Sequence, residues 1–133
     1  MKENELTQLV IGKAIEVHND VGPGVFEHVY KEYLALLLRE SGLLVEQEKP
    51  IPFIRRGIKL NCGYRMDLLV ENKLVLEIKS VEAINDAHLA QLLTYLRLGN
   101  YHLGLIINFN VVKLKSGIRR VINGHEPLIF RAT

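Results

Sequence analysis

The stretch Leu74-Val75-Leu76-Glu77-Ile78-Lys79-Ser80 places two charged residues inside a run that is otherwise apolar. Successive side chains of a strand point to opposite faces of a sheet, so Glu77 and Lys79 share one face with Val75. Such a hydrophobic run is typical of a central strand, where an unpaired charge is expensive to bury. An acid and a base side by side in this position indicate a prepared site, suited to hold a cation near a substrate phosphate.

The segment before this strand is expected to bring a second acid to it. Residues 58–70 read as a strand, and Glu71-Asn72-Lys73 turns the chain into the next one. If the turn is centred on its middle residue, Asp67 lies opposite Glu77 on the same face. Two carboxylates at that separation repel each other unless a proton or a cation lies between them, and Mg²⁺ binds through one or two carboxylates with water and phosphate oxygens. Lys79 could then orient the attacking water or offset charge on the phosphate.

The bland alternative is an ion-paired patch on a solvated sheet face. An E-x-K triplet alone arises by chance about once in every couple of chains of this length. The apolar setting and the opposed Asp67 are what favour a functional site over that alternative.

The remaining segments predict helices around a sheet. We expect helices over residues 6–17, 25–41 and 86–98, and extended segments over residues 44–54, 58–70, 74–80, 101–108 and part of 111–122. Pro50 and Pro52 restrict the first extended segment to an edge or bulged strand, and Asn85 or Asp86 is the expected cap of the third helix. The strands on either side of that helix should be parallel, whereas short turns make the earlier strands antiparallel. The predicted fold is α/β, a mixed sheet flanked by helices.

Composition indicates one domain over residues 1–133, with 48% hydrophobic and 24% charged residues. The net charge of +2 permits nucleic-acid binding without arguing for it. The single cysteine, Cys62, cannot form an internal disulfide, and no apolar run reaches the length of a membrane span. The polar start does not read as a signal peptide. We therefore expect a cytoplasmic protein that does not enter a membrane.

The second helix carries a third acid. Its expected apolar face consists of Phe26, Val29, Tyr30, Tyr33 and Leu37. Glu27 falls at the flank of this face, so its carboxylate should be half-buried and directed toward the sheet. As a lone observation, Glu27 is better explained as a first-turn glutamate that favours the helix dipole.

The third helix has a polar stripe beside its leucine face. His88, Gln91 and Tyr95 share this stripe at a spacing of i, i+3 and i+7. Because the helix packs back on the sheet directly after the strand with Glu77, the stripe could reach Lys79 and a bound phosphate. An ordinary helix flank would show the same spacing, and His88 is given little weight as a metal ligand.

Several basic residues could contact a nucleic-acid backbone. Arg55, Arg56 and Arg65 are the candidates. Spacing alone does not distinguish phosphate contacts from charges that serve solubility.

Three motifs give the chain a resemblance to a known family. Gly24-Val25-Phe26-Glu27-His28-Val29-Tyr30 resembles the GxxExxY pattern after which a family of small proteins is named, and that family is similar to the PD-(D/E)xK nuclease superfamily. Asp67 and Glu77-Ile78-Lys79 resemble the superfamily signature, with Met66 where the name-giving proline would stand. Residues 91–95 resemble the QxxxY motif of RecB-type nucleases. The resemblance extends from about residue 11 to residue 122.

This resemblance implies a restriction-endonuclease-like α-β-β-β-α-β core with an extra N-terminal helix. It also implies that Asp67, Glu77 and the Ile78 carbonyl are ligands of Mg²⁺ or Mn²⁺. Glu27 would be a further ligand or would hold a metal-bound water.

The same resemblance gives roles to the remaining motif residues. Lys79 would position the nucleophilic water, while Gln91 and Tyr95 would orient Lys79 or the scissile phosphate. The expected activity is a Mg²⁺-dependent nuclease that acts on nucleic acid, DNA in the first place, and a homodimer is plausible. The alternatives are a catalytically inactive nuclease-fold module that binds nucleic acid or a protein, since folds are reused, and a hydrolase of small phosphoesters.

Overall fold

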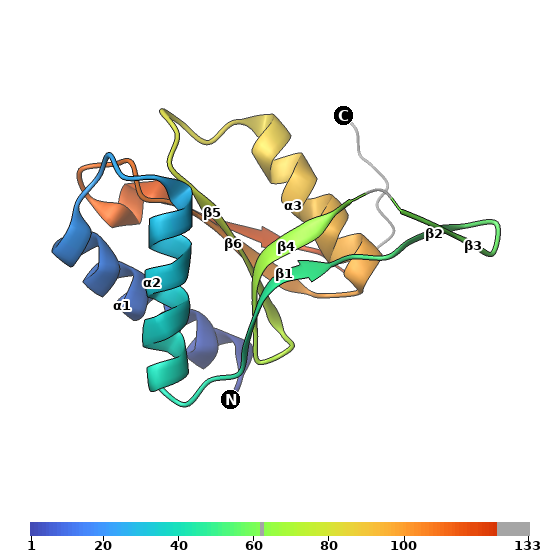
Figure 1. Ribbon diagram of the computed structural model, residues 1–133, viewed down its shortest axis with the longest axis horizontal. Coiled ribbons are helices and arrows are strands. Elements are labelled where there is room, and N and C mark those ends of the chain that lie inside the picture. Colours follow the sequence, from blue (N-terminus) through green and yellow to red (C-terminus); the bar gives the residue numbers. More distant parts are fainter. Residues whose placement is uncertain (62, 125–133) are drawn as a thin grey trace.

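The structure, a computed structural model, describes residues 1–61 and 63–124, so Cys62 lies outside the described residues. Within them, a five-stranded sheet with the order β1-β4-β5-β6-β7 has helices on both faces, and β2 and β3 form a separate two-stranded ribbon. Helices α1 and α2 cover one face and α3 covers the other (Figure 1). The elements are α1 (Glu3–Val21), α2 (Glu27–Glu40), β1 (Val45–Pro50), β2 (Phe53–Arg55), β3 (Ile58–Leu60), β4 (Arg65–Val70), β5 (Leu74–Lys79), α3 (Asp86–Gly99), β6 (Leu103–Asn108), the 3₁₀ turn η1 (Leu114–Gly117) and β7 (Ile118–Ile122).

The strand pairing confirms the predicted mixed sheet. β5 and β6 are parallel, joined through the crossover helix α3, and the other pairs in the sheet are antiparallel. β1, which ends at Pro50, lies at an edge of the sheet, where a proline costs no ladder hydrogen bond. Val70 pairs with Leu74, so the β4–β5 turn is centred on Asn72 as expected.

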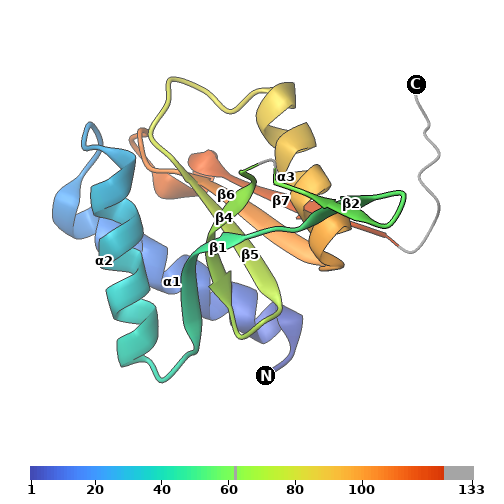
Figure 2. The ribbon, with the colours of Figure 1, turned by 45° about the vertical axis from the view of Figure 1, so that its right-hand side comes forward.

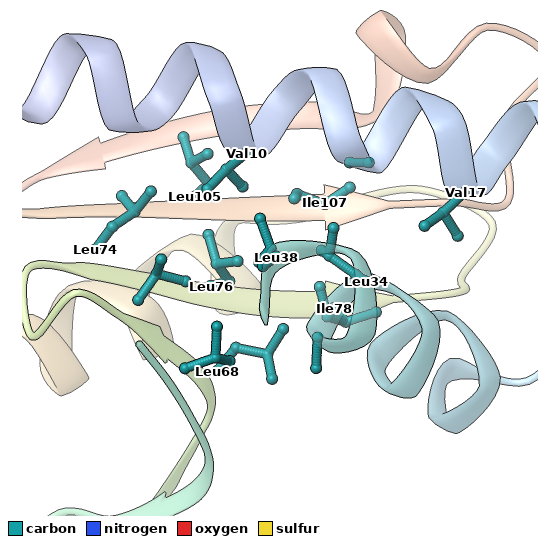
Figure 3. Close-up of a cluster of buried hydrophobic side chains, with 14 of the residues drawn as sticks. Val10, Val17, Leu34, Leu38, Leu68, Leu74, Leu76, Ile78, Leu105 and Ile107 are labelled. Atoms are coloured by element: carbon teal, nitrogen blue, oxygen red, sulfur yellow. The ribbon is translucent and has the colours of Figure 1, made fainter. Parts of the chain in front are cut away.

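The main core lies between the sheet and the helices α1 and α2 (Figure 3). Leu6, Val10, Ala14 and Val17 recur at helical spacing along α1 and are fully buried. They pack against the even-numbered residues of β5, which share one face of the strand. Burying one such aliphatic side chain contributes about 1.5–3 kcal/mol.

The buried face of α2 differs from the predicted one. Phe26 is 84% exposed and Val29 is 42% exposed, whereas Tyr30, Leu34 and Leu38 are fully buried. The Tyr30 ring stacks on Phe109 with the ring centroids 4.4 Å apart. This contact sets the rotation of the helix, so the prediction was wrong for its first two members; Tyr33 and Leu37 lie at the margin of the core.

Helix α3 packs on the opposite face over a smaller cluster, which includes Leu92, Leu96 and Val75. Gly104 in β6 lets the Leu92 side chain of α3 approach the sheet closely, because a Cβ at this position would lie 3.0 Å from that side chain. The predicted cap is confirmed: Asn85 Oδ1 accepts a hydrogen bond from the His88 N–H at 3.0 Å. Among the described helices, none combines the length and the apolar character that a membrane span requires.

Candidate active site

Asp67 and Glu77 meet where the backbone pairing of β4 and β5 gives way to side-chain hydrogen bonds. The last pair in register on this side is Leu68 with Leu76. Beyond it, the Asp67 N–H donates to Glu77 Oε2 at 3.1 Å, and the Ile78 N–H donates to Asp67 Oδ2 at 2.8 Å. Each carboxylate therefore accepts a backbone hydrogen from the opposite strand. The two acids that the hairpin register predicted to be neighbours are neighbours.

Burial, the largest cause in each case, makes both carboxylates reluctant to ionise. Glu77 is only 6% exposed, and its burial, followed by the charge of Asp67, raises its pKa from 4.5 to about 8. Burial also raises the pKa of Asp67, although the Ile78 N–H and the charges of Lys31 and Lys79 work in the opposite direction. A pair of this kind is stabilised in its charged form by any cation that binds between or beside the two groups.

The donor set of the pair fits a hard divalent cation. Asp67 and Glu77 offer carboxylate oxygens and Ile78 offers a backbone carbonyl, which is the oxygen chemistry that Mg²⁺ and Mn²⁺ prefer. Within residues 1–61 and 63–124, no three His, Cys, Asp or Glu side chains come together as a metal-binding group. Two carboxylates are enough for Mg²⁺, which usually completes its shell with water and substrate phosphate.

Glu27 lies apart from this pair, at the end of β5. Its Oε2 accepts a hydrogen bond from the Ser80 N–H at 3.2 Å, and Ser80 Oγ donates to the Val25 carbonyl at 2.8 Å. Glu27 is exposed and not half-buried as predicted. It shares a helical stripe with the buried Leu34 and Leu38, but as the first residue of α2 it precedes the buried part of that stripe. These two bonds tie the start of α2 to the residue after Lys79. Glu27 also lines a cleft of about 620 Å³ together with Phe26 and Ser80.

The last residue of the GxxExxY pattern holds the loop that precedes Glu27. The Tyr30 hydroxyl donates to the Gly22 carbonyl and accepts from the Val25 N–H at 3.2 Å. Gly24 has a φ of 91°, in the region that favours glycine. The pattern therefore has a structural explanation: the glycine allows the turn, the tyrosine fixes it, and Glu27 is presented toward β5.

Lys79 lies half-buried beside the acid pair, on the same face of β5 as Glu77. Its charge lowers the pKa of both Asp67 and Glu77. The Lys79 carbonyl accepts the Phe109 N–H at 2.9 Å. Beside it, the buried Asn108 amide donates to the Val81 carbonyl and accepts from the Val81 N–H, both at 3.0 Å. The chain on the C-terminal side of Lys79 is thus fixed to β6.

Comparison with known proteins identifies a family for the chain. The model of the PD-(D/E)XK nuclease superfamily matches residues 4–121. The chain belongs to the PD-(D/E)XK nuclease superfamily. No curated protein and no solved structure matches the chain. The match covers the described helices and strands except for the first residue of α1 and the last residue of β7. It does not test the GxxExxY assignment, which stays a prediction.

Two further motif residues of this nuclease-superfamily member come from α3. Tyr95 is buried, and its ring lies 5.8 Å from that of Tyr64. Burial, followed by the charges of Glu77 and Asp67, raises the pKa of Tyr95 to about 12. Tyr95 therefore keeps its proton at neutral pH. Gln91, one turn earlier, is exposed, and its predicted role toward Lys79 or a phosphate stays a prediction.

The sequence interpretation missed an ion pair next to the nuclease-type acids. Lys31 of α2 pairs with Glu48 of β1. Burial lowers the pKa of Lys31, but the bond and the charge of Glu48 outweigh it, and the pKa is raised. Glu48 raises the pKa of both Asp67 and Glu77 through its charge. A signal existed for each: Lys31 follows Glu27 by one helical turn, and Glu48 falls opposite Asp67 once β1 is paired with β4.

Proposed function

We propose that this chain is a Mg²⁺- or Mn²⁺-dependent nuclease that hydrolyses phosphodiester bonds in nucleic acid, and DNA in particular. The observation that carries the proposal is the pair formed by the buried Glu77 and the partly buried Asp67, with Lys79 on the same face of β5. Membership of the PD-(D/E)XK nuclease superfamily supports the same reaction class.

The residues around the pair divide the work of hydrolysis. A divalent cation, when bound, supplies Lewis-acid activation of water and neutralises phosphate charge. Asp67, Glu77 and the Ile78 carbonyl are the groups that would hold it, with Glu27 as a further ligand or as the holder of a water. Lys79 places an ammonium beside the acids, where it can orient the attacking water and offset charge that develops on the phosphate. Tyr95, which keeps its proton, can donate a hydrogen bond to the same phosphate or orient Lys79.

Cleavage by the purified chain tests this proposal. Duplex, single-stranded, flapped and branched DNA, and RNA, are incubated with Mg²⁺, with Mn²⁺ and with EDTA. We expect metal-dependent cleavage of DNA that falls by at least roughly 100-fold in Glu77→Gln and in Lys79→Met. Glu40→Gln and Lys113→Met remove the same charges at exposed positions away from the acid pair and serve as matched controls.

Two results would contradict the nuclease assignment in different ways. If no nucleic acid is cleaved with either metal, the enzyme proposal fails. If the chain binds nucleic acid or a protein with the same affinity after Glu77→Gln and Lys79→Met, and cleaves nothing, it is a binding module on a nuclease fold. Cleavage of nucleotides but not of polynucleotides would instead identify a hydrolase of small phosphoesters.

A homodimer is part of the proposal, since two identical sites would cut both strands of a duplex. Light scattering of the chain, with and without duplex DNA, measures this directly.

A further inference from the structure

The ribbon of β2 and β3, residues 53–60, projects away from the sheet and is here called the arm (Figures 1 and 2). Its two strands are joined by a two-residue turn in which Arg56 and Gly57 both have positive φ, 55° and 77°. Such a turn matches the right-handed twist of a hairpin, and its first central position ordinarily favours asparagine, aspartate or glycine. In this chain that position presents a guanidinium at the tip of the arm.

The surface of the arm combines cations with exposed apolar side chains. Arg55, Arg56, Lys59 and Arg65 are the charged residues between Pro50 and Met66, and no acid occurs in that stretch. The strand register places Ile54 and Lys59 on one face and Arg55 and Ile58 on the other. Ile54, Ile58 and Leu60 are among the exposed large hydrophobic residues of the described chain. A solvated arm needs no such apolar side chains, whereas an arm that contacts base edges uses them.

The base of the arm is built onto the candidate active site. The Phe53 ring meets the Tyr64 ring edge-on at 6.1 Å, and the Tyr64 ring lies 5.8 Å from that of Tyr95, which belongs to the same buried cluster as Val75 of β5. The Ile51 N–H donates to the Tyr64 carbonyl at 2.9 Å and closes the base of the arm. A cleft of about 500 Å³ lies there, with the side chains of Lys59 and Arg65 at its wall.

The shape of the arm fits one form of nucleic acid. Three residues per strand extend roughly 10 Å, and the major groove of B-form DNA, about 12 Å wide and 8.5 Å deep, admits a two-stranded ribbon. The major groove of an A-form RNA helix is too narrow for side chains to read. A single strand offers no groove at all.

We propose that the arm enters the major groove of duplex DNA and holds that duplex against the side of the sheet that carries Asp67 and Glu77. The arginines and Lys59 contact phosphates along the groove walls, and Ile54 and Ile58 contact base edges. This inference rests on the proposed function, because the acid pair is the chemistry that the arm would serve. It goes further by naming the substrate as double-stranded DNA and the element that binds it.

Binding in EDTA tests the arm separately from cleavage. Fluorescence anisotropy measures affinity for a short DNA duplex, for its single strand and for the same sequence as an RNA duplex, each over a series of salt concentrations. We expect the highest affinity for the DNA duplex, and a lower affinity for the single strand and for the RNA duplex. Arg56→Ala/Lys59→Ala should weaken duplex binding roughly 10-fold or more and lower the salt slope by about 2, since two phosphate contacts are lost.

Matched variants separate the arm from charge in general and from folding. Lys113→Ala/Lys115→Ala removes the same charge from the exposed surface around η1, and it should leave affinity and slope unchanged. Ile58→Ser should weaken duplex binding without changing the slope, because it removes a contact that is not ionic. Thermal melting of each variant shows that the fold is kept.

A duplex in which sugars attached to cytosine fill the major groove should compete poorly with the unmodified duplex for binding to the chain. A drug that occupies the minor groove should leave duplex binding unchanged. The arm is excluded as the duplex-binding element if Arg56→Ala/Lys59→Ala and the control pair lose affinity equally. Unchanged binding of the groove-filled duplex excludes it too. Undiminished cleavage of duplex DNA by the arm variant would overturn this inference and leave the nuclease proposal standing. Arm-dependent binding without any cleavage would do the reverse.

Discussion

The two faces of β5 differ in what covers them and in what they contain. Leu74, Leu76 and Ile78 are sealed beneath α1 and α2 in the larger core, whereas Glu77 and Lys79 lie on the face toward α3. One strand therefore serves stability on one side and chemistry on the other, separated only by the alternation of its side chains. Substitutions one residue apart in β5 should therefore differ in their effect: on one face they lower the stability of the fold, and on the other they abolish cleavage.

The largest effect on stability is expected on the α1 and α2 face. Leu76→Ala removes a fully buried side chain and should lower the free energy of unfolding by about 2–5 kcal/mol, because it leaves a cavity. Urea unfolding measures this change. Leu36→Ala, at a half-exposed position of α2, is the control and should change stability by less than about 0.5 kcal/mol. Equal losses in both variants would mean that β5 is not the centre of this core.

The opposite face should respond to pH. In the metal-free chain, Glu77 holds its proton up to a pKa of about 8, whereas the same group titrates near 4.5 when unfolded. Between these values the native state binds more protons, so the free energy of unfolding falls as pH rises from 4.5 to about 8. We expect a loss of roughly 2–4 kcal/mol across this window in EDTA.

Glu77→Gln tests that assignment, because the amide does not ionise. It should flatten the pH profile and make the metal-free chain more stable than the wild type above pH 8, while cleavage is lost. A wild-type profile that rises across the window would contradict the raised pKa.

Binding of a divalent metal should offset the loss of stability that the ionised Glu77 causes. At pH 8, addition of about 10 mM MgCl₂ should stabilise the wild type by about 1–3 kcal/mol through binding to the native state. NaCl at matched ionic strength serves as the control. Asp67→Asn/Glu77→Gln should show no such gain in a melting experiment. A gain that survives in the double variant would place the cation elsewhere.

The smallest effect on stability is expected at Ser80, the residue that follows β5. Ser80→Ala removes the bond from Oγ to the Val25 carbonyl and should cost about 1 kcal/mol. Because this bond helps hold the start of α2, the cleavage rate should fall by more than the loss of folded protein accounts for. Ser116→Ala, at an exposed serine of η1, should change neither.

The parts of the fold and the site that could be predicted are those set by local sequence. The turn centred on Asn72 fixes the register of β4 and β5, and with it the meeting of Asp67 and Glu77. The cap at Asn85 is equally local. These features depend on a few neighbouring residues, so periodicity and turn chemistry were enough.

The features that could not be predicted depend on distant contacts. Helix α2 carries two apolar stripes, and the choice between Phe26 and Leu34 was made by the stacking of Tyr30 on Phe109, which is far away in the sequence. That stacking sets the rotation of the helix, whereas the exposure of Glu27 follows from its place as the first residue of α2. The pair of Lys31 and Glu48 requires both that rotation and the pairing of β1.

The reciprocal bonds between Asp67 and Glu77 and the facing backbone have a consequence for how this chain could lose its activity over evolutionary time. Each acid accepts a hydrogen from the opposite strand, so removing either side chain leaves a backbone donor without its acceptor. A descendant that no longer cut anything would still require an acceptor at both places. Asparagine and glutamine, rather than alanine, are the replacements expected in such a lineage.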